Sequence, residues 1–133
     1  MAHSIKYISP NKADIALIRG DSLILTLNCE QDKTSYEFED GDSATFTVRR
    51  SYKETQNGKP IIQKVVDMFN NPELIIEPKD TNTLPYGNYK YDIQLNFASG
   101  IVDTVLMGTF SLEKEVTWCE IRIYWWFKFN LNI

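Results

Sequence analysis

The sequence predicts an all-β domain in which about seven short strands pack as an antiparallel sandwich. Apolar and polar residues alternate with a period of two in nearly every segment, as they do in a strand that has one face on a core and the other in water. Turn-forming residues separate these segments, and no longer window shows a convincing helical period. The short connections favour antiparallel pairing, and the whole pattern is typical of a sandwich or barrel.

Two strands with clear alternation are predicted in the first half of the chain, after a shorter one. The shorter strand lies near Ile15 to Ile18 and ends at the turn-like Arg19-Gly20-Asp21. The two longer strands are expected to bury alternate side chains and to expose those between them. Their apolar residues are Leu23, Leu25 and Leu27 in one strand, and Ala44, Phe46 and Val48 in the other.

The middle of the chain predicts two weaker strands and one helical turn. The strands are expected at Ile61 to Asp67 and at Glu73 to Glu77, with Asn70-Asn71-Pro72 as the turn between them. Only Asp80 to Leu84 has a sequence that suits a helical turn. Long helices are therefore not expected.

The longest unbroken alternation predicts a hairpin over residues 89–112, with Ser99-Gly100 as its turn. The apolar residues of its first strand are Tyr89, Tyr91, Ile93, Leu95 and Phe97. The returning strand continues the same rhythm with Val102, Thr104, Leu106, Gly108, Phe110 and Leu112. Each strand of the hairpin is expected to have one buried face.

Tyr89 indicates which kind of sandwich the strands form. The chain passes from Asp80 through Pro85-Tyr86-Gly87-Asn88 into the longest strand, where the Tyr89 hydroxyl can reach back to upstream backbone. Such a tyrosine corner is typical of immunoglobulin-like sandwiches, although a tyrosine that only packs in the core is the alternative. We therefore expect an all-β, immunoglobulin-like antiparallel β-sandwich of about seven strands, with an extra C-terminal strand left open.

The C-terminal segment is unusually apolar for its position outside the predicted sandwich. The chain of 133 residues supports one core, with residues 1–13 as an N-terminal arm, 14–117 as the sandwich, and 118–133 as an apolar strand or tail. A free strand of this composition would aggregate, so its own sheet, a second copy or a partner should cover it. The predicted interaction surface consists of Trp118, Ile121, Ile123, Trp125, Trp126, Phe127 and Phe129.

Charge and hydropathy disfavour nucleic acid and membranes as partners. The formal net charge is -4, and acidic and basic residues are interspersed, so no basic stripe is present to neutralise phosphates. No apolar run approaches the roughly 18 residues of a membrane span. The first residues lack the charged-then-apolar layout of a secretory signal. We expect the chain to stay in the cytoplasm where it is made, or in a particle assembled there.

Few residues are suited to catalysis or to holding a cofactor. His3 is the only histidine, which leaves the chain without the commonest general base and metal ligand elsewhere. We expect no enzyme activity, no cofactor and no metal site. The acidic residues Glu37, Glu39, Asp40 and Asp42 are interpreted as a solvated loop, with a weak cation site as the alternative, because their spacing does not match a calcium loop.

The two cysteines form no metal or redox motif. Cys29 and Cys119 lie far apart in the sequence and have no further cysteines near them. They are interpreted as unpaired thiols in or near strands. A disulfide between them is left open.

Four places along the chain carry a resemblance to a known family. They are Arg19-Gly20-Asp21-Ser22 before alternating leucines, Gly41 to Arg49, Asp80 to Leu95, and Gly108-Thr109-Phe110 with Glu115-Val116-Thr117. With these, residues 14–117 resemble small structural domains of tailed phages and prophages of Gram-positive bacteria, and are similar to the N-terminal part of phage baseplate upper proteins. The motifs are turns and strands. The resemblance implies an immunoglobulin-like building block or attachment module of a virion, without catalytic residues.

The expected function is therefore that of a non-enzymatic tail- or baseplate-associated virion protein, located in the virion or the bacterial cytoplasm. Its expected partners are other virion proteins and, through the C-terminal strand, further copies of itself. The chain departs from the family pattern after Thr117. Residues 118–133 are thus either an added strand that docks on a neighbouring subunit or a tail produced by a shifted reading frame.

Surface aromatic residues suggest an alternative function. Tyr52, Tyr86, Tyr124 and Trp126 are candidates to stack on sugar rings or to fill pockets on a protein partner. The alternative is a carbohydrate-binding or host-adhesion module.

Overall fold

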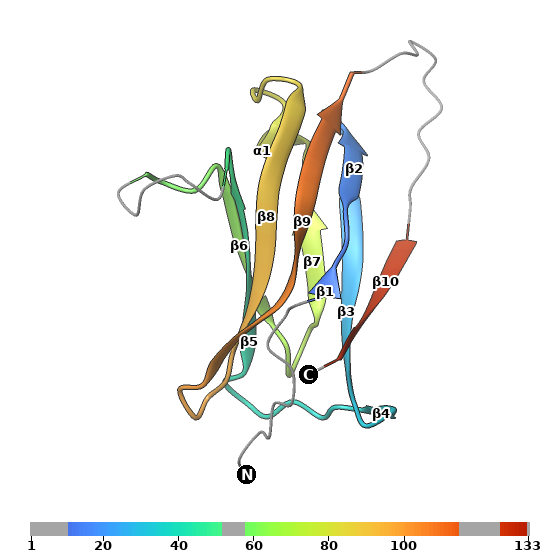
Figure 1. Cartoon of the computed structure of the whole chain (residues 1–133), viewed down its shortest axis with the longest axis vertical. Coiled ribbons are helices and arrows are strands. Elements are labelled where there is room, and N and C mark those ends of the chain that lie inside the picture. Colours follow the sequence, from blue (N-terminus) through green and yellow to red (C-terminus); the bar gives the residue numbers. More distant parts are fainter. Residues whose placement is uncertain (1–10, 52–57, 115–125, 133) are drawn as a thin grey trace.

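The chain folds mostly into β-strands, which form two sheets. The computed structural model describes residues 11–51, 58–114 and 126–132, and describes side chains for residues 12–51 and 58–114. Figure 1 shows the two sheets facing each other. The prediction of a mostly-β fold with two sheets is confirmed. Both sheets contain parallel pairs, so the prediction of purely antiparallel pairing is wrong.

The larger sheet has six strands and is curled into a half-barrel. Its order is β1-β9-β8-β5-β6, and β2 also pairs with β9. The strands are β1 (Asn11–Lys12), β2 (Ile15–Ile18), β5 (Ser43–Arg49), β6 (Ile62–Asp67), β8 (Gly87–Asn96) and β9 (Val102–Glu113). Both β1 and β2 run parallel to β9. They come from the opposite end of the described chain, so no short connection forces them to be antiparallel.

The smaller sheet is built around one long strand, β3 (Leu23–Gln31). On one side of β3, β7 (Glu73–Ile76) and β4 (Thr34–Ser35) pair antiparallel with its first and last residues respectively. The remaining pairing is with β10 (Trp126–Asn132), which runs parallel to β3. β3 is thus the strand that joins all the others of this sheet.

Most predicted elements lie where the sequence indicated, within one or two residues. However, β3 continues past the predicted alternation to Gln31, β1 and β4 were not predicted, and the helical turn, α1 (Pro78–Thr81), begins before the predicted Asp80. The earlier start follows from Pro78, whose ring suits the first turn of a helix, and from a reciprocal cap in which the Glu77 amide donates to the Asp80 carboxylate at 2.7 Å.

A bulge in β9 interrupts the predicted alternation of the hairpin. Leu106 lies opposite Ile93 and Thr104 lies opposite Gln94, so Val105 is an extra residue in β9. Val105 and Leu106 are both buried, whereas Val102 is 54% exposed, so the prediction that Val102 continues the buried face is wrong. A bulge bends its strand and increases the local twist, which is consistent with the curl of the larger sheet.

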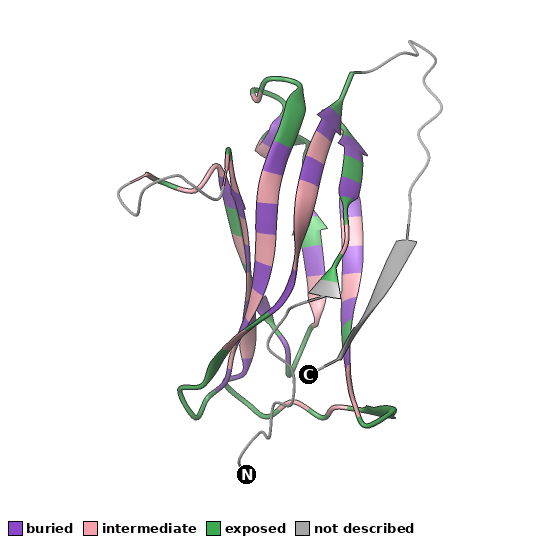
Figure 2. Ribbon diagram, in the orientation of Figure 1, coloured by how far each residue is buried: buried purple, intermediate pink, exposed green. Residues whose placement is uncertain are grey.

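The core lies between the inward faces of the two sheets. Figure 2 shows buried positions alternating with less buried ones along β3, β5 and β8. At its centre the Phe46 ring centroid lies 5.6 Å from that of Tyr91 and 6.0 Å from that of Phe110. The fully buried rings of three neighbouring strands therefore pack against one another, as aromatic pairs favour at these separations.

The segment between β1 and β2 lies directly against β9. A side chain added at Gly108 would meet the Ala13 carbonyl oxygen at 1.8 Å, so only glycine allows this approach. The Tyr91 hydroxyl donates to the same oxygen at 2.6 Å. Residues 11–13, at the end of the predicted N-terminal arm, are thus fixed on the larger sheet.

Tyr89 forms the predicted tyrosine corner. Its ring is buried, and its hydroxyl donates to the Pro85 carbonyl oxygen at 2.6 Å. The bond ties the start of β8 to the turn that follows α1. The prediction of this hydrogen bond is confirmed.

Replacing Tyr89 with phenylalanine is expected to lower the free energy of unfolding by about 1 kcal/mol, because the hydrogen bond from the hydroxyl of this buried tyrosine to the Pro85 carbonyl is lost. Urea unfolding followed by fluorescence measures the change. Tyr86→Phe is the matched control, since the Tyr86 ring is exposed and should tolerate the change. Equal stability of the Tyr89→Phe variant and the parent chain would show that the corner contributes nothing.

Candidate functional site

The predicted C-terminal surface divides between described and undescribed parts of the chain. Trp118, Ile121, Ile123 and Trp125 lie outside the described residues. The other three belong to β10, where Trp126 is opposite Ile24, Phe127 opposite Leu25, and Phe129 opposite Leu27. β10 therefore occupies one edge of β3 over seven residues. An exposed strand edge is a template for pairing, so this edge is where a strand from elsewhere would add.

A hollow lies on the other side of β3, and the register of the strands explains its position. β7 pairs with β3 as far as Thr26, and β4 pairs with it from Glu30 onward. Residues 27–29 thus lie in the gap between the two short strands. The Leu27 amide donates to the Pro72 carbonyl at 2.8 Å, and the Cys29 carbonyl accepts from the Tyr36 amide at 2.8 Å.

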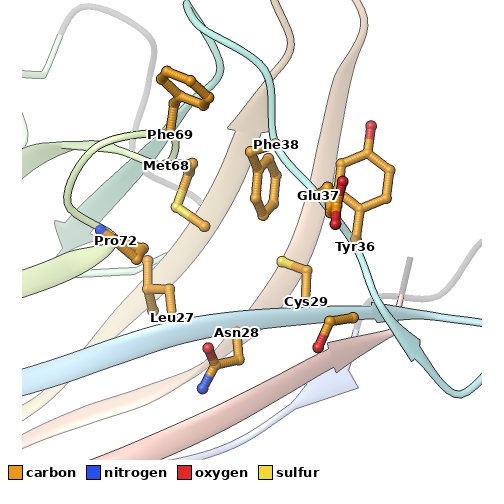
Figure 3. Close-up of a pocket in the computed structure, with 10 residues that line it drawn as sticks. Leu27, Asn28, Cys29, Tyr36, Glu37, Phe38, Met68, Phe69 and Pro72 are labelled. Atoms are coloured by element: carbon orange, nitrogen blue, oxygen red, sulfur yellow. The ribbon is translucent and has the colours of Figure 1, made fainter.

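Three segments of the chain supply the walls of the hollow, which has a volume of about 400 Å³ (Figure 3). β3, the connection from β4 to β5, and the β6–β7 turn each contribute side chains. The lining residues are Leu27, Asn28, Cys29, Ser35, Tyr36, Glu37, Phe38, Met68, Phe69 and Pro72. Most of these are apolar or aromatic, so the surface suits an apolar group.

The aromatic walls of the hollow are continuous with the core. The Tyr36 ring meets the Phe38 ring edge-on at 4.9 Å between centroids, and the Phe38 ring stacks with that of Phe97 at 6.4 Å. Phe69, from the β6–β7 turn, is 51% exposed. Figure 3 shows the Phe38 side chain and that of Met68 reaching in between Phe69 and the residues of β3. No sequence pattern marked Phe38, Met68 or Phe69 as part of a site.

Asp42 holds together the loops around the hollow. Its side chain accepts hydrogen bonds from the Glu39 amide and the Ala98 amide, both at 2.8 Å, and its carbonyl accepts from the Met68 amide at 3.1 Å. Asp42 is only 4% exposed, so the interpretation of this residue as part of a solvated loop is wrong. A buried carboxylate persists because it is fully hydrogen-bonded.

The other members of the acidic cluster, Glu37, Glu39 and Asp40, are exposed as expected. In the part of the chain that the structure describes, no three His, Cys, Asp or Glu side chains are grouped so that they could hold a metal ion. The weak cation site that the sequence left open therefore has no support among the described residues.

The hollow lies at an end of the molecule where negative charge is concentrated. This acidic end comprises residues 30–42, 67–73 and 97–103, which the strand registers bring together. Its carboxylates are Glu30, Asp32, Glu37, Glu39, Asp40, Asp42, Asp67, Glu73 and Asp103, and Lys33 is the one basic residue in these ranges. Close carboxylates of like sign raise the local negative potential.

Asp67 and Tyr36, near the hollow, have shifted pKa values. Hydrogen bonds from the Asn70 side chain and the Asn70 and Phe69 amides lower the pKa of Asp67, which keeps this carboxylate charged. Burial raises the pKa of the Tyr36 phenol, and the negative charges of Asp42 and Glu39 raise it further. The shift of Tyr36 is consistent with a negative potential at this end, whereas hydrogen bonds determine the shift of Asp67.

The surface aromatics proposed for sugar binding are not brought together among the described residues. Tyr52 and Tyr124 lie outside them, and Trp126 belongs to β10, whose side chains are not described. Tyr86 is exposed, but the Arg19 guanidinium covers its ring at 4.1 Å from the centroid. The carbohydrate-binding alternative therefore stays a prediction.

The comparisons with known proteins found no family model that matches this sequence and no curated protein similar to it. Within the described residues, no helix is long and apolar enough to cross a membrane. The geometry of the strand edge and the hollow is thus the basis for assigning a function.

The Cys29 thiol is expected to react slowly with alkylating reagents. Burial raises the pKa of this thiol to about 12, and only the thiolate reacts. At about pH 8.5, where an ordinary cysteine is half ionised, Cys29 should react slower by roughly three orders of magnitude.

Mass spectrometry of a Cys119→Ser variant treated with iodoacetamide measures the rate at Cys29 alone. Cys119 lies outside the described residues, so its pairing with Cys29 stays untested, and the substitution removes it from the experiment. The same variant unfolded in urea provides the reference rate. A native rate equal to the unfolded rate would contradict the burial of this thiol.

Proposed function

We propose that this chain is a non-enzymatic structural domain of a phage or prophage virion, and that it works through protein–protein contacts. The virion assignment is supported by the resemblance of residues 14–117 to phage structural domains. The contact function is supported by the pairing of β10 with β3, which is the observation that carries the proposal. The chain occupies a tail or baseplate and binds other virion proteins there.

We further propose that the domain belongs to the immunoglobulin-like type. The strand order β9-β8-β5-β6 opposite β7-β3 supports this assignment, since the corresponding strands of immunoglobulin-like sandwiches divide between the two sheets in this way. The tyrosine corner at the start of β8 supports it as well. The parallel pairings of β1 and β2 with β9 and of β10 with β3 depart from that pattern.

Strand addition is the proposed mode of contact. Main-chain hydrogen bonds to a strand edge supply affinity, and alternate side chains supply specificity. The chain contains both the acceptor edge, on β3, and the strand that fits it, β10. In the assembled particle, β10 of one copy pairs with β3 of the next, which is strand exchange between identical chains.

The proposal that the chain is not an enzyme is supported by its side chains. The sequence has a single histidine, His3, and the Cys29 thiol has a pKa of about 12, which makes it a poor nucleophile. The carboxylates of Asp42 and Asp80 accept hydrogen bonds from backbone amides, in a turn and in a helix cap, which are structural roles.

Light scattering of the purified chain tests the contact function. We expect the full chain to form oligomers whose mass rises with concentration, because β10 exchanges between copies. Replacing both Lys128 and Phe129 with proline removes two successive backbone N–H groups from β10. Successive N–H groups of a strand point to opposite sides, so one of the two faces β3. This variant should therefore be monomeric. Replacing Lys128 and Asn130 with alanine is the matched control and should preserve the oligomers.

A strict monomer at high concentration that also fails to bind the products of neighbouring genes would contradict the proposal. The neighbouring genes give an independent test of the virion assignment. Genes for tail and portal proteins are expected beside this one, and their absence from every sequenced locus would count against a phage origin.

A further inference from the structure

The hollow between β4 and β7 has no role in strand addition, because β10 pairs with the opposite edge of β3. The hollow combines aromatic walls with exposure to solvent, a combination that is uncommon in a buried core. Its walls are aromatic and partly open to solvent, with Phe69 51% exposed. An open hollow of about 400 Å³ with aromatic walls has the size and the lining of a binding pocket.

The charge around the hollow narrows the choice of occupant. Glu37 is one of the lining residues, and Glu39, Asp40 and Asp67 lie in the segments that form the walls. The hydrogen bonds that Asp67 accepts from Asn70 and Phe69 hold its carboxylate in the same turn as the Phe69 ring. These carboxylates would repel an acidic occupant, and a purely aliphatic occupant would make no electrostatic interaction with them.

A basic side chain fits both the aromatic walls and the negative charge around the hollow. The methylene stem of lysine or arginine packs on apolar surface while its charged end stays near solvent and carboxylates. Arginine also stacks on aromatic faces, and cations are attracted to them. A metal ion fits less well, because the described residues hold no group of three metal-ligating side chains.

We propose that this hollow binds a lysine or arginine side chain that a protein partner presents, with its stem against Phe38 and Phe69 and its charge beside Glu37. The inference names the chemistry of the partner and rests on the protein-binding part of the proposed function. It does not depend on the virion assignment or on strand exchange.

The two loops that line the site are fixed, together with the neighbouring β8–β9 turn, before any partner binds. Asp42 joins the β4–β5 connection to the β8–β9 turn through the Ala98 amide and to the β6–β7 turn through the Met68 amide. Stacking of Phe38 on Phe97 fixes the ring that faces the occupant. Preorganised walls lower the entropy cost of binding, so a single inserted side chain can be held there.

Nuclear magnetic resonance of the full chain tests the inference with two synthetic probes. The first is the peptide acetyl-Gly-Arg-Gly-Arg-Gly-amide, and the second has glutamate in place of both arginines. We expect the arginine peptide to shift the backbone amide signals of Glu37, Phe38 and Phe69, and to bind in competition with salt. The glutamate peptide should shift none of them.

Two variants separate a built site from diffuse attraction to the acidic end. Phe69→Ala is expected to weaken binding of the arginine peptide about three-fold, the size of an exposed cation–π contact, and Glu37→Gln about two-fold. Val65→Ala is the matched control for the first variant, because Val65 is 72% exposed on the larger sheet. Glu113→Gln, an exposed carboxylate outside the acidic end, is the control for the second.

Several outcomes would overturn the inference. One is that amide signals shift over the whole acidic end but not at Phe69. Another is that Phe69→Ala leaves the affinity for the arginine peptide unchanged. The third is that the glutamate peptide binds as tightly as the arginine peptide. Circular dichroism of each variant shows that it is folded, so a loss of affinity is assigned to the site. If the arginine peptide binds as expected while light scattering finds a strict monomer, strand exchange fails and the present inference stands. The reverse result leaves strand exchange in place and removes the hollow as a site.

Discussion

The pairing of β3 with its neighbours is the constraint on which the rest of the molecule depends. β3 gives the core its alternate leucines and holds β7, β4 and β10 in one sheet. Both proposed contact surfaces follow from it, because β10 fills one edge and the gap between β7 and β4 opens the hollow on the other. A shift of β3 by one residue against β7 would turn its leucines away from the core and displace the hollow.

The two sheets have different tasks in this arrangement. The larger sheet supplies a rigid wall, in which the rings of Phe46, Tyr91 and Phe110 pack together and Gly108 lets the Ala13 backbone lie against β9. The smaller sheet leaves strand edges to be covered. Asp42 connects the two at the acidic end, since its hydrogen bonds reach both the β8–β9 turn and its own turn. Rigid loops on a packed scaffold are where binding residues are commonly found.

Local patterns allowed the prediction of local structure. The tyrosine corner involves Pro85 and Tyr89, four residues apart, and the alternation of β8 needs no partner to be recognised. The bulge at Val105 and the parallel pairing of β2 with β9 depend on strands that meet only in the folded chain. The hollow depends on where two short strands stop along β3. Phe38 and Phe69, which are distant in sequence, therefore gave no signal of a shared site.

Amide hydrogen exchange along β3 tests the role of this strand most directly. The Leu27 amide donates to Pro72 on the β7 side, and successive amides of a strand point to opposite sides, so Thr26 and Asn28 direct theirs toward β10. In the full chain, all three amides should exchange slowly. In a chain that ends at Lys114, Thr26 and Asn28 should exchange fast while Leu27 stays protected. Equally fast exchange of Thr26 and Asn28 in both chains would contradict the account, because β10 would then not cover this edge.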